Sequence, residues 1–322
     1  MSFDNGSLSE WKVSIVLVLY DPEELTVNHN ALEELFNSLC LIKNKYELVI
    51  VINQPIEISH NIIKLINKFH FHSNVQVVQA AENLGPAGGF NLGYSKCNHS
   101  DLYVYLSTDA IIVDGNILND MIHLFKNNSH IGITHPLSQF EDDDTFNAGT
   151  HANLQAYNNI LTEVEESHLS NEERYNFAKN KESHIINSLV LESRGSQGDT
   201  STPLIQAPLT FLGIRREVVE LTKGFDSNMI CGENIDLCLR ALEYGYKTVR
   251  LNTAIIGHRR ISFRVIGQGH GSLTKSRDVL AVEMIDYLNE KHGDYKDKYY
   301  KLRFKYTWPI VFILRTVKAF LR

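Results

Sequence analysis

Residues 13–20 read VSIVLVLY, an almost uninterrupted run of apolar and β-branched side chains. A strand that is apolar at nearly every position has both faces covered, as parallel strands do in the centre of an α/β sheet. Residues 47–52 (ELVIVI) and 102–106 (LYVYL) have the same character. These three runs predict central strands of a mostly parallel sheet and therefore an α/β fold.

Two segments between these runs have the spacing of amphipathic helices. The spacing predicts helices over residues 30–41 and 58–69, with a third strand over 75–79. An alternation of strand and helix requires right-handed crossovers in one sheet, with ligands bound beyond the carboxyl ends of its strands. The polar residues at these strand ends are the candidate ligand contacts: Tyr20, Asp21, Asn53, Glu82, Asn83, Ser107, Thr108 and Asp109.

The third strand is followed by a glycine-rich stretch, residues 82–93 (ENLGPAGGFNLG). Gly88 and Gly89 allow a close backbone approach, and a helix that begins here offers N–H groups to a phosphate. The stretch is neither the GxGxxG of a dinucleotide site nor the GK[ST] of a P-loop. By itself it predicts a tight turn as readily as a ligand loop.

Residues 221–248, LTKGFDSNMICGENIDLCLRALEYGYKT, contain a loop and then an amphipathic helix that ends at Gly245. Glu233 and Asp236 lie at the start of this helix, where its dipole favours ionised carboxylates. An ionised carboxylate is what a general base needs to take a proton from a hydroxyl group. The alternative interpretation is that both acids only cap the helix.

Taken in order, these segments resemble the family-2 inverting glycosyltransferases of the GT-A fold, especially the rhamnosyltransferase-like members acting on bacterial surface polysaccharides. Residues 81–94 (AENLGPAGGFNLGY) are similar to the family's N-x-G-x-(A/G)-G-x-N-x-G segment, and residues 105–115 (YLSTDAIIVDG) stand where it has a metal-binding DxD. TKGFD followed by GENIDLCLRALEYGYKT resembles its GGFD…EDxDLxxR motif, and AIIGHRR stands where it has a late metal-ligand histidine. The resemblance spans residues 12–265.

This resemblance implies an inverting transfer of a sugar from a UDP- or dTDP-linked donor to a hydroxyl of a glycan or lipid-linked acceptor. Glu233 is implied as the base, with Asp236 as the alternative base or its orienting partner. Asp109 and His258 are implied as ligands of Mg²⁺ or Mn²⁺. The implied donor contacts are Tyr20, Asp21, Asn53, Asn83, Gly88, Asn91, Ser107, Thr108, Arg259 and Arg260.

Three positions depart from the family pattern, because Ile52, Ser107 and Asn234 stand where the family usually has acids. Base recognition then falls to Asn53, Asp21 or backbone groups. The lost acids leave open a degenerate GT-A scaffold that binds nucleotide or glycan without turnover. A nucleotidyltransferase is disfavoured, because the stretch after the first strand is acidic rather than basic.

The charge of the chain is unevenly distributed. The net charge is −7, yet residues 296–322 hold eight Lys or Arg against one acid, interleaved with aromatic residues. This pattern is typical of a segment that lies on an anionic membrane surface. A packed C-terminal helix or an oligomer contact is the alternative, and nucleic acid is disfavoured.

The expected organisation is a GT-A domain over residues 1–265 and an extension over 266–322. In the domain, residues 12–110 form the nucleotide-binding half and residues 111–265 the acceptor half. Near the start of the extension, the glycine-rich residues 267–271 indicate a lid loop over the donor, with an ordinary surface loop as the alternative. The polar N-terminus, the lack of an apolar run of membrane-spanning length and four cysteines without CxxC spacing predict a cytoplasmic protein, peripheral at the inner face of the plasma membrane.

Overall fold

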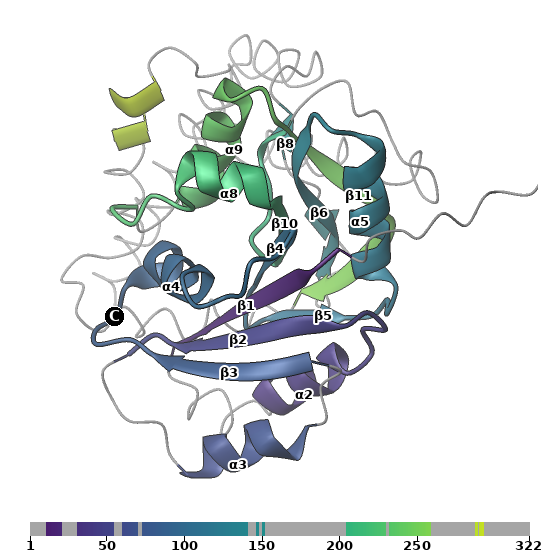
Figure 1. Cartoon of the computed structure of the whole chain (residues 1–322), viewed down its shortest axis with the longest axis vertical. Coiled ribbons are helices and arrows are strands. Elements are labelled where there is room, and N and C mark those ends of the chain that lie inside the picture. Colours follow the sequence, from purple (N-terminus) through teal and green to yellow (C-terminus); the bar gives the residue numbers. More distant parts are fainter. Residues whose placement is uncertain are drawn as a thin grey trace, which may run out of the picture.

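The computed structural model describes residues 11–20, 31–54, 60–69, 73–140, 146–147, 150–151, 204–229, 232–258, 287–288 and 290–292. Within these ranges a nine-stranded sheet forms the centre of the molecule (Figure 1), in the order β3-β2-β1-β4-β10-β6-β11-β5 with β7 beside β6. A separate two-stranded sheet joins β8 to β9. The strands are β1 Val13–Leu19, β2 Tyr46–Ile52, β3 Ser73–Gln79, β4 Leu102–Leu106, β5 Ala110–Ile112, β6 Ile131–Phe140, β7 Phe146–Asn147, β8 Thr150–His151, β9 Leu204–Gln206, β10 Phe211–Arg215 and β11 Lys247–His258.

The sheet is parallel in its first half and mixed in its second. Strands β3, β2, β1 and β4 pair in parallel, as the sequence predicts. Strand β10 then runs antiparallel between β4 and β6, and β5 runs antiparallel to β11. The sheet as a whole is therefore less parallel than the sequence predicts.

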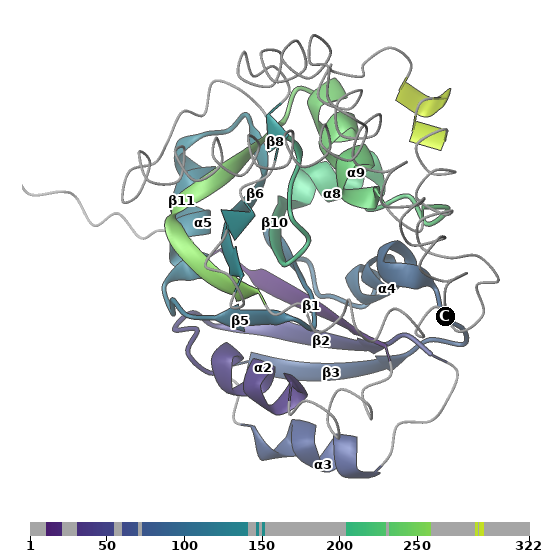
Figure 2. The ribbon, with the colours of Figure 1, turned by 180° about the vertical axis from the view of Figure 1, so that it is seen from behind.

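Helices cover both faces of the sheet (Figures 1 and 2). The core on one face joins the strands to α2, α3 and α5, and the core on the other joins them to α4, α8 and α9. Their bounds are α2 Ala31–Leu39, α3 His60–Lys68, α4 Gly85–Tyr94, α5 Ile117–Asn127, α8 Arg216–Thr222 and α9 Glu233–Glu243.

The central strands are apolar throughout because their side chains alternate between these two cores. In β4, Leu102, Val104 and Leu106 lie in the core with α2 and α5. Tyr103 and Tyr105 lie in the opposite core, with α4. The side of β4 that carries Tyr105 is therefore the side that α4 and α9 cover.

The glycine-rich stretch that follows β3 forms helix α4, and its glycines allow this helix to pack closely on β1. A Cβ at Gly89 would lie 2.6 Å from Val18 Cγ1, and one at Gly93 would lie 2.3 Å from Val16 Cγ1. Side chains at these positions would push the helix off the strand. The close approach predicted from the sequence is thus an approach to a neighbouring strand.

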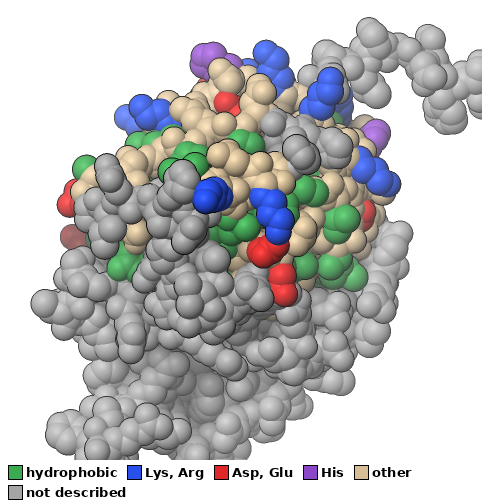
Figure 3. All heavy atoms as spheres, turned by 90° about the horizontal axis from the view of Figure 1, so that it is seen from below, with side chains coloured by type: hydrophobic (Ala, Val, Ile, Leu, Met, Phe, Trp, Pro, Cys, Tyr) green, Lys and Arg blue, Asp and Glu red, His purple; other side chains and the backbone are tan. Residues whose placement is uncertain are grey.

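The side of the molecule that carries α3 shows basic, acidic and apolar side chains interspersed where they are described (Figure 3). One ion pair there joins Lys68 Nζ of α3 to Glu33 Oε1 of α2 at 2.5 Å. No helix in the described part of the chain is long and apolar enough to span a bilayer.

Candidate active site

The carboxyl end of β4 and the end of β11 bring Asp109 and His258 together. Residues 107–109 connect β4 to β5, and β5 pairs with β11 so that Ala110 lies opposite His258. Asp109 Oδ2 lies 3.1 Å from His258 Nε2, and the two residues are only 5% and 9% exposed. The two residues predicted as metal ligands are therefore direct neighbours.

A second contact fixes the other oxygen of this carboxylate. The hydroxyl of Ser107 donates a hydrogen bond to Asp109 Oδ1, and the backbone N–H of Ser107 donates to Thr210 O of the segment before β10. The Asp109 carboxylate is thus oriented by one neighbour on each oxygen. Ser107 and Thr108 were predicted as donor contacts, and the structure places both at this strand end, half-buried.

The distance between Asp109 and His258 suits two ligands of one divalent cation. Neighbouring ligands of an octahedral ion with bonds of about 2.1 Å lie about 3.0 Å apart. The observed 3.1 Å matches that spacing. The described residues contain no group of three or more His, Cys, Asp or Glu side chains that could hold a metal ion. The pair therefore fits two adjacent coordination positions and leaves the remaining positions to other molecules.

Glu233 is the first residue of α9 and is only 5% exposed. Glutamate is seldom buried to this degree unless it is paired or takes part in chemistry. Burial raises the pKa of Tyr105, and the negative charges of Glu233 and Asp109 raise it further. Both carboxylates thus lie near enough to Tyr105 for their charges to act on its hydroxyl.

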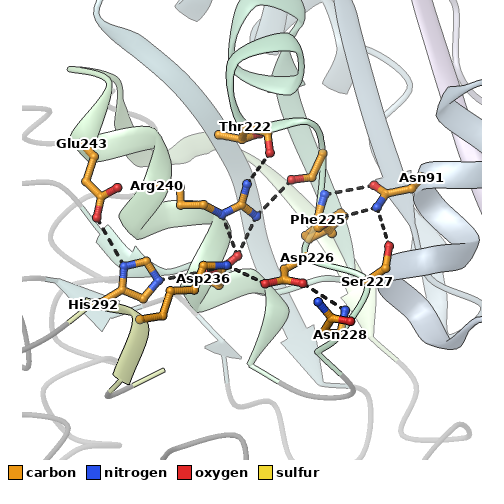
Figure 4. A network of polar contacts seen from close by, with 12 residues as sticks. Asn91, Thr222, Phe225, Asp226, Ser227, Asn228, Asp236, Arg240, Glu243 and His292 are labelled. Atoms are coloured by element: carbon orange, nitrogen blue, oxygen red, sulfur yellow. Dashed lines mark hydrogen bonds and ion pairs between the residues drawn. The ribbon is translucent and has the colours of Figure 1, made fainter. Parts of the chain in front are cut away.

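Asp236 lies three residues further along α9 and is fully buried, at the centre of a polar network (Figure 4). Arg240 Nε lies 2.7 Å from Asp236 Oδ2, while His292 Nε2 and Lys291 Nζ lie 2.9 and 2.8 Å from Asp236 Oδ1. Burial alone would raise the pKa of Asp236. The hydrogen bonds from His292 and Arg240, and the charge of Arg240, instead lower this pKa far below the usual range of aspartate.

Arg240 connects this network to the preceding loop. Its two terminal nitrogens donate to Thr222 O at 2.6 Å and to Gly224 O at 3.0 Å. Thr222 is the last residue of α8, and Gly224 lies in the turn that follows, where Lys223 and Gly224 have φ angles of +58° and +76°. Arg240 therefore fixes the start of this turn against α9.

Asn91 of α4 fixes the same turn from the other side (Figure 4). Its side-chain amide donates to Phe225 O at 2.7 Å and to Ser227 Oγ at 3.0 Å, and its carbonyl accepts from Phe225 N–H at 3.0 Å. The family resemblance implies that Asn91 contacts the nucleotide-sugar donor. The structure shows this amide engaged by the protein itself, connecting the glycine-rich helix to residues 224–226, called the GFD loop below.

Asn53 is also used within the protein. It is 3% exposed, its amide donates to Asn83 Oδ1 and Gly85 O, and its carbonyl accepts from Leu84 N–H. Asn53 and Asn83 thus meet at the carboxyl edge of the sheet, where they shape the entry to α4. Tyr20 follows β1 at this edge and is half-buried. Gly88 lies inside α4, buried, where a Cβ would lie 2.8 Å from Leu84 Cβ, so its smallness serves packing.

Residues 15–196, more than half of the chain, match the family model described as glycosyl transferase family 2. The chain belongs to this family. Comparison with curated proteins found no match.

Solved glycosyltransferase structures share the fold of this family-2 protein at low identity. S. aureus TarS 1–349 is 13% identical with a TM-score of 0.52, and the alignment covers 92% of this chain and 72% of TarS 1–349. The mannosyltransferase PcManGT from Pyrobaculum calidifontis, in complex with GDP-Man and Mn²⁺, is 11% identical with a TM-score of 0.50, covering 78% of this chain and 57% of that one. GalNAc-T7 with UDP, GalNAc and Mn²⁺ is 13% identical with a TM-score of 0.50, covering 78% and 44%. These likenesses support the GT-A fold predicted from the sequence.

Several predicted residues of this family-2 protein lie outside the described ranges. Asp21, Arg259 and Arg260 are among them, as are the expected lid loop at 267–271 and the basic segment at 296–322. Tyr105, Lys291 and His292 stand out only in the structure, because a lysine and a histidine 55 and 56 positions after Asp236 carry no local signal. Arg240 is the arginine of the segment that resembles EDxDLxxR, so a signal for it is present in the sequence.

Proposed function

We propose that this protein is an inverting glycosyltransferase that moves a sugar from a nucleotide diphosphate sugar to an acceptor hydroxyl. The observation that carries the proposal is the placement of two acidic sites around one tyrosine. Glu233 and Asp109 both act on Tyr105, and Asp109 in turn contacts His258. In this proposal the base and the site for the leaving group both lie near the carboxyl end of β4.

Glu233 is the proposed general base. Its carboxylate would take the proton of the acceptor hydroxyl while the hydroxyl oxygen attacks the anomeric carbon. The bond between that carbon and the diphosphate oxygen breaks, and the nucleotide diphosphate leaves with the electron pair. A single displacement of this kind inverts the anomeric configuration, and the start of a helix favours the ionised carboxylate that it requires.

Asp109 and His258 would hold a divalent cation, which supplies positive charge to the leaving diphosphate when it is bound. Ser107 holds the Asp109 carboxylate in the orientation that faces His258. A nitrogen ligand favours a transition metal such as Mn²⁺ over Mg²⁺, which prefers oxygen ligands.

Asp236 is proposed as a supporting residue. A base must reach the hydroxyl that it deprotonates, and Asp236 is fully buried with its oxygens engaged by Arg240, Lys291 and His292. Between the two acids predicted from the sequence, this arrangement favours Glu233 as the base and Asp236 as the residue that fixes its helix.

The donor is proposed to be UDP- or dTDP-linked, and its sugar to be of the hexosyl, rhamnosyl or galactofuranosyl type. The family resemblance of the motifs supports this range. The structures of TarS and of GalNAc-T7 contain UDP, and that of PcManGT contains GDP-Man.

The acceptor is proposed to be a glycan or a lipid-linked glycan of bacterial surface polysaccharide synthesis, at the cytoplasmic face of the plasma membrane. The charge and aromatic content of residues 296–322 support this part of the proposal, because such segments bind anionic lipid. Co-sedimentation with anionic liposomes should be lost when these residues are deleted and weakened by salt. Equal sedimentation of both forms would instead favour a packed or oligomeric tail.

The experiment that tests the function is a screen of nucleotide sugars with Mn²⁺, read first by thermal unfolding and then by release of nucleotide diphosphate. A donor at 100 times its dissociation constant stabilises the folded state by about 2.7 kcal/mol. We expect stabilisation by a uridine- or thymidine-linked sugar, followed by turnover with acceptor. Binding without turnover on any glycan acceptor would favour the degenerate scaffold, and binding of none would overturn the proposal.

A further inference from the structure

Helix α9 begins without a cap of its own. The residue before it, Gly232, has a φ of +79°, and no side chain at the N-cap position bonds to the first turn. Helix starts leave backbone N–H groups without helical partners, and a capping side chain normally fixes the turn. The first turn of α9, which carries Glu233 and Asp236, therefore depends on contacts from elsewhere in the chain.

The described residues 287–288 and 290–292, called the clamp segment below, supply such contacts. Leu288 is 7% exposed and packs in a cluster with Met229, Ile235 and Leu239. A Cβ at Gly232 would lie 3.3 Å from Leu288 Cδ1, so this leucine packs against the residue that precedes α9. The clamp segment thus has an apolar anchor at the uncapped end of the helix.

Lys291 joins two carboxylates that belong to different elements. Its Nζ lies 2.6 Å from Asp226 Oδ2 and 2.8 Å from Asp236 Oδ1. Asp226 belongs to the GFD loop and also accepts from the hydroxyl of Tyr287 at 2.9 Å. Lys291 therefore sets the separation between this loop and the first turn of α9.

His292 joins the two ends of the helix. Its side chain is 3% exposed, its Nε2 lies 2.9 Å from Asp236 Oδ1, and its Nδ1 lies 3.3 Å from Glu243 Oε1 (Figure 4). Asp236 stands at the start of α9 and Glu243 at its last residue. One imidazole thus holds the helix at both ends.

We propose that Lys291 and His292 are positioning residues for the transfer reaction, which fix the first turn of α9 and through it the Glu233 carboxylate. This inference rests on the proposed role of Glu233 as the base. Neither residue touches the reacting atoms in this account. Their effect reaches Glu233 through Asp236, which lies on the same helical turn, and a displacement of about 1 Å at a catalytic group lowers the rate by roughly 10²-fold.

The test compares variants that remove each contact with variants that keep it. Lys291→Met keeps the aliphatic stem without the charge, and Lys291→Arg restores a cation. His292→Leu removes both ring nitrogens, and His292→Gln restores a donor toward Asp236. The control is Lys68→Met, which breaks another lysine–carboxylate pair on the opposite side of the sheet.

The first measurement is amide hydrogen exchange, which requires no knowledge of the substrate. We expect Lys291→Met and His292→Leu to speed exchange at least about tenfold in peptides that cover α9 and the GFD loop, with β1 and β2 unchanged. Lys291→Arg and Lys68→Met should exchange like the wild type. Unchanged exchange of α9 in both loss variants would overturn the inference, whether or not a donor sugar is known.

The second measurement is steady-state kinetics with the donor identified by the screen. We expect kcat of Lys291→Met and His292→Leu to fall about 10- to 100-fold, with the donor KM within about threefold, and Lys291→Arg and His292→Gln to recover most of the loss. Wild-type kcat in both loss variants, or a loss confined to KM, would contradict the positioning role while leaving the proposed function intact. An inactive wild-type enzyme would contradict the proposed function alone, because the exchange measurement still decides whether the clamp segment fixes α9.

Discussion

Asp109 and His258 lie 149 positions apart in the sequence, and Asp109 Oδ2 lies 3.1 Å from His258 Nε2 in the folded chain. The contact follows from strand pairing, because β5 runs antiparallel to β11 with Ala110 opposite His258. The sheet therefore places an oxygen ligand and a nitrogen ligand side by side at the end of β4.

Replacement of either member of this pair should weaken metal-dependent donor binding. We expect Asp109→Asn and His258→Ala each to raise the dissociation constant of the donor at least about tenfold with Mn²⁺ present, while the donor binds wild type and variants alike without metal. Isothermal titration in Mn²⁺ and in chelator measures both. Transfer that continues unchanged in chelator would show that no metal takes part.

Ser107→Ala should weaken metal binding indirectly, because Ser107 donates a hydrogen bond to the proposed ligand Asp109. Loss of the hydrogen bond that orients Asp109 should cost about 10- to 100-fold in metal affinity, the usual effect of a residue that supports a ligand. Mn²⁺ binding followed by its paramagnetic signal measures this affinity. Thr108→Ala, at the neighbouring position, is the control and should bind metal more strongly than Ser107→Ala.

Asp236→Asn should lower stability at neutral pH, by roughly 3–5 kcal/mol, because it breaks a buried network of charges. The pKa of Asp236 is lowered in the folded state. Its contribution is therefore complete above the unfolded pKa of about 3.9 and is lost as the pH falls toward the folded pKa. The difference between wild type and Asp236→Asn in urea unfolding should be present at pH 5 and shrink below pH 4. Asp120→Asn, in the first turn of α5, should show a far smaller difference.

Gly224→Ala should destabilise the protein more than Gly245→Ala does. Both glycines have positive φ angles, +76° and +84°, where an alanine costs about 1 kcal/mol. A Cβ at Gly224 would also lie 2.3 Å from Asn91 Oδ1, whereas a Cβ at Gly245 would have no heavy atom within 4 Å among the described residues. Gly224→Ala therefore breaks the contact between α4 and the GFD loop as well, and thermal unfolding should show at least twice the loss. Equal losses would mean that Asn91 adds nothing to stability.

The parallel half of the fold follows from the sequence, and the other half does not. Residues 13–20, 47–52 and 102–106 are apolar on both faces, which only a covered strand tolerates, and all three form strands close to the predicted bounds. Strand β11 pairs with β6 and reaches His258 through a register shift between Leu251 and Ile255. The antiparallel insertion of β10 between β4 and β6 depends on pairing across the chain, for which the sequence carries no local pattern.

The candidate site divides in the same way. The sequence indicates Glu233 and Asp109 because they stand at the ends of predicted elements. A helix start favours an ionised carboxylate, and ligands bind beyond the carboxyl ends of parallel strands. Asn91 and Asn53 stood there too, yet their amides bond to loops of the protein itself. Lys291 and His292 could not be predicted, because their partners Asp226 and Asp236 are more than 50 positions away and tertiary packing alone brings them together.

The most direct test of the account is the transfer rate of Glu233→Gln, measured with the identified donor and acceptor at saturating concentrations. The substitution keeps the size of the side chain and removes its ability to take a proton, so we expect kcat to fall about 10²- to 10⁴-fold with donor binding and thermal unfolding unchanged. Glu220→Gln, on α8, is the matched control and should retain wild-type kcat. Near wild-type turnover of Glu233→Gln, together with an inactive but folded Asp236→Asn, would contradict the account and assign the base to the other carboxylate.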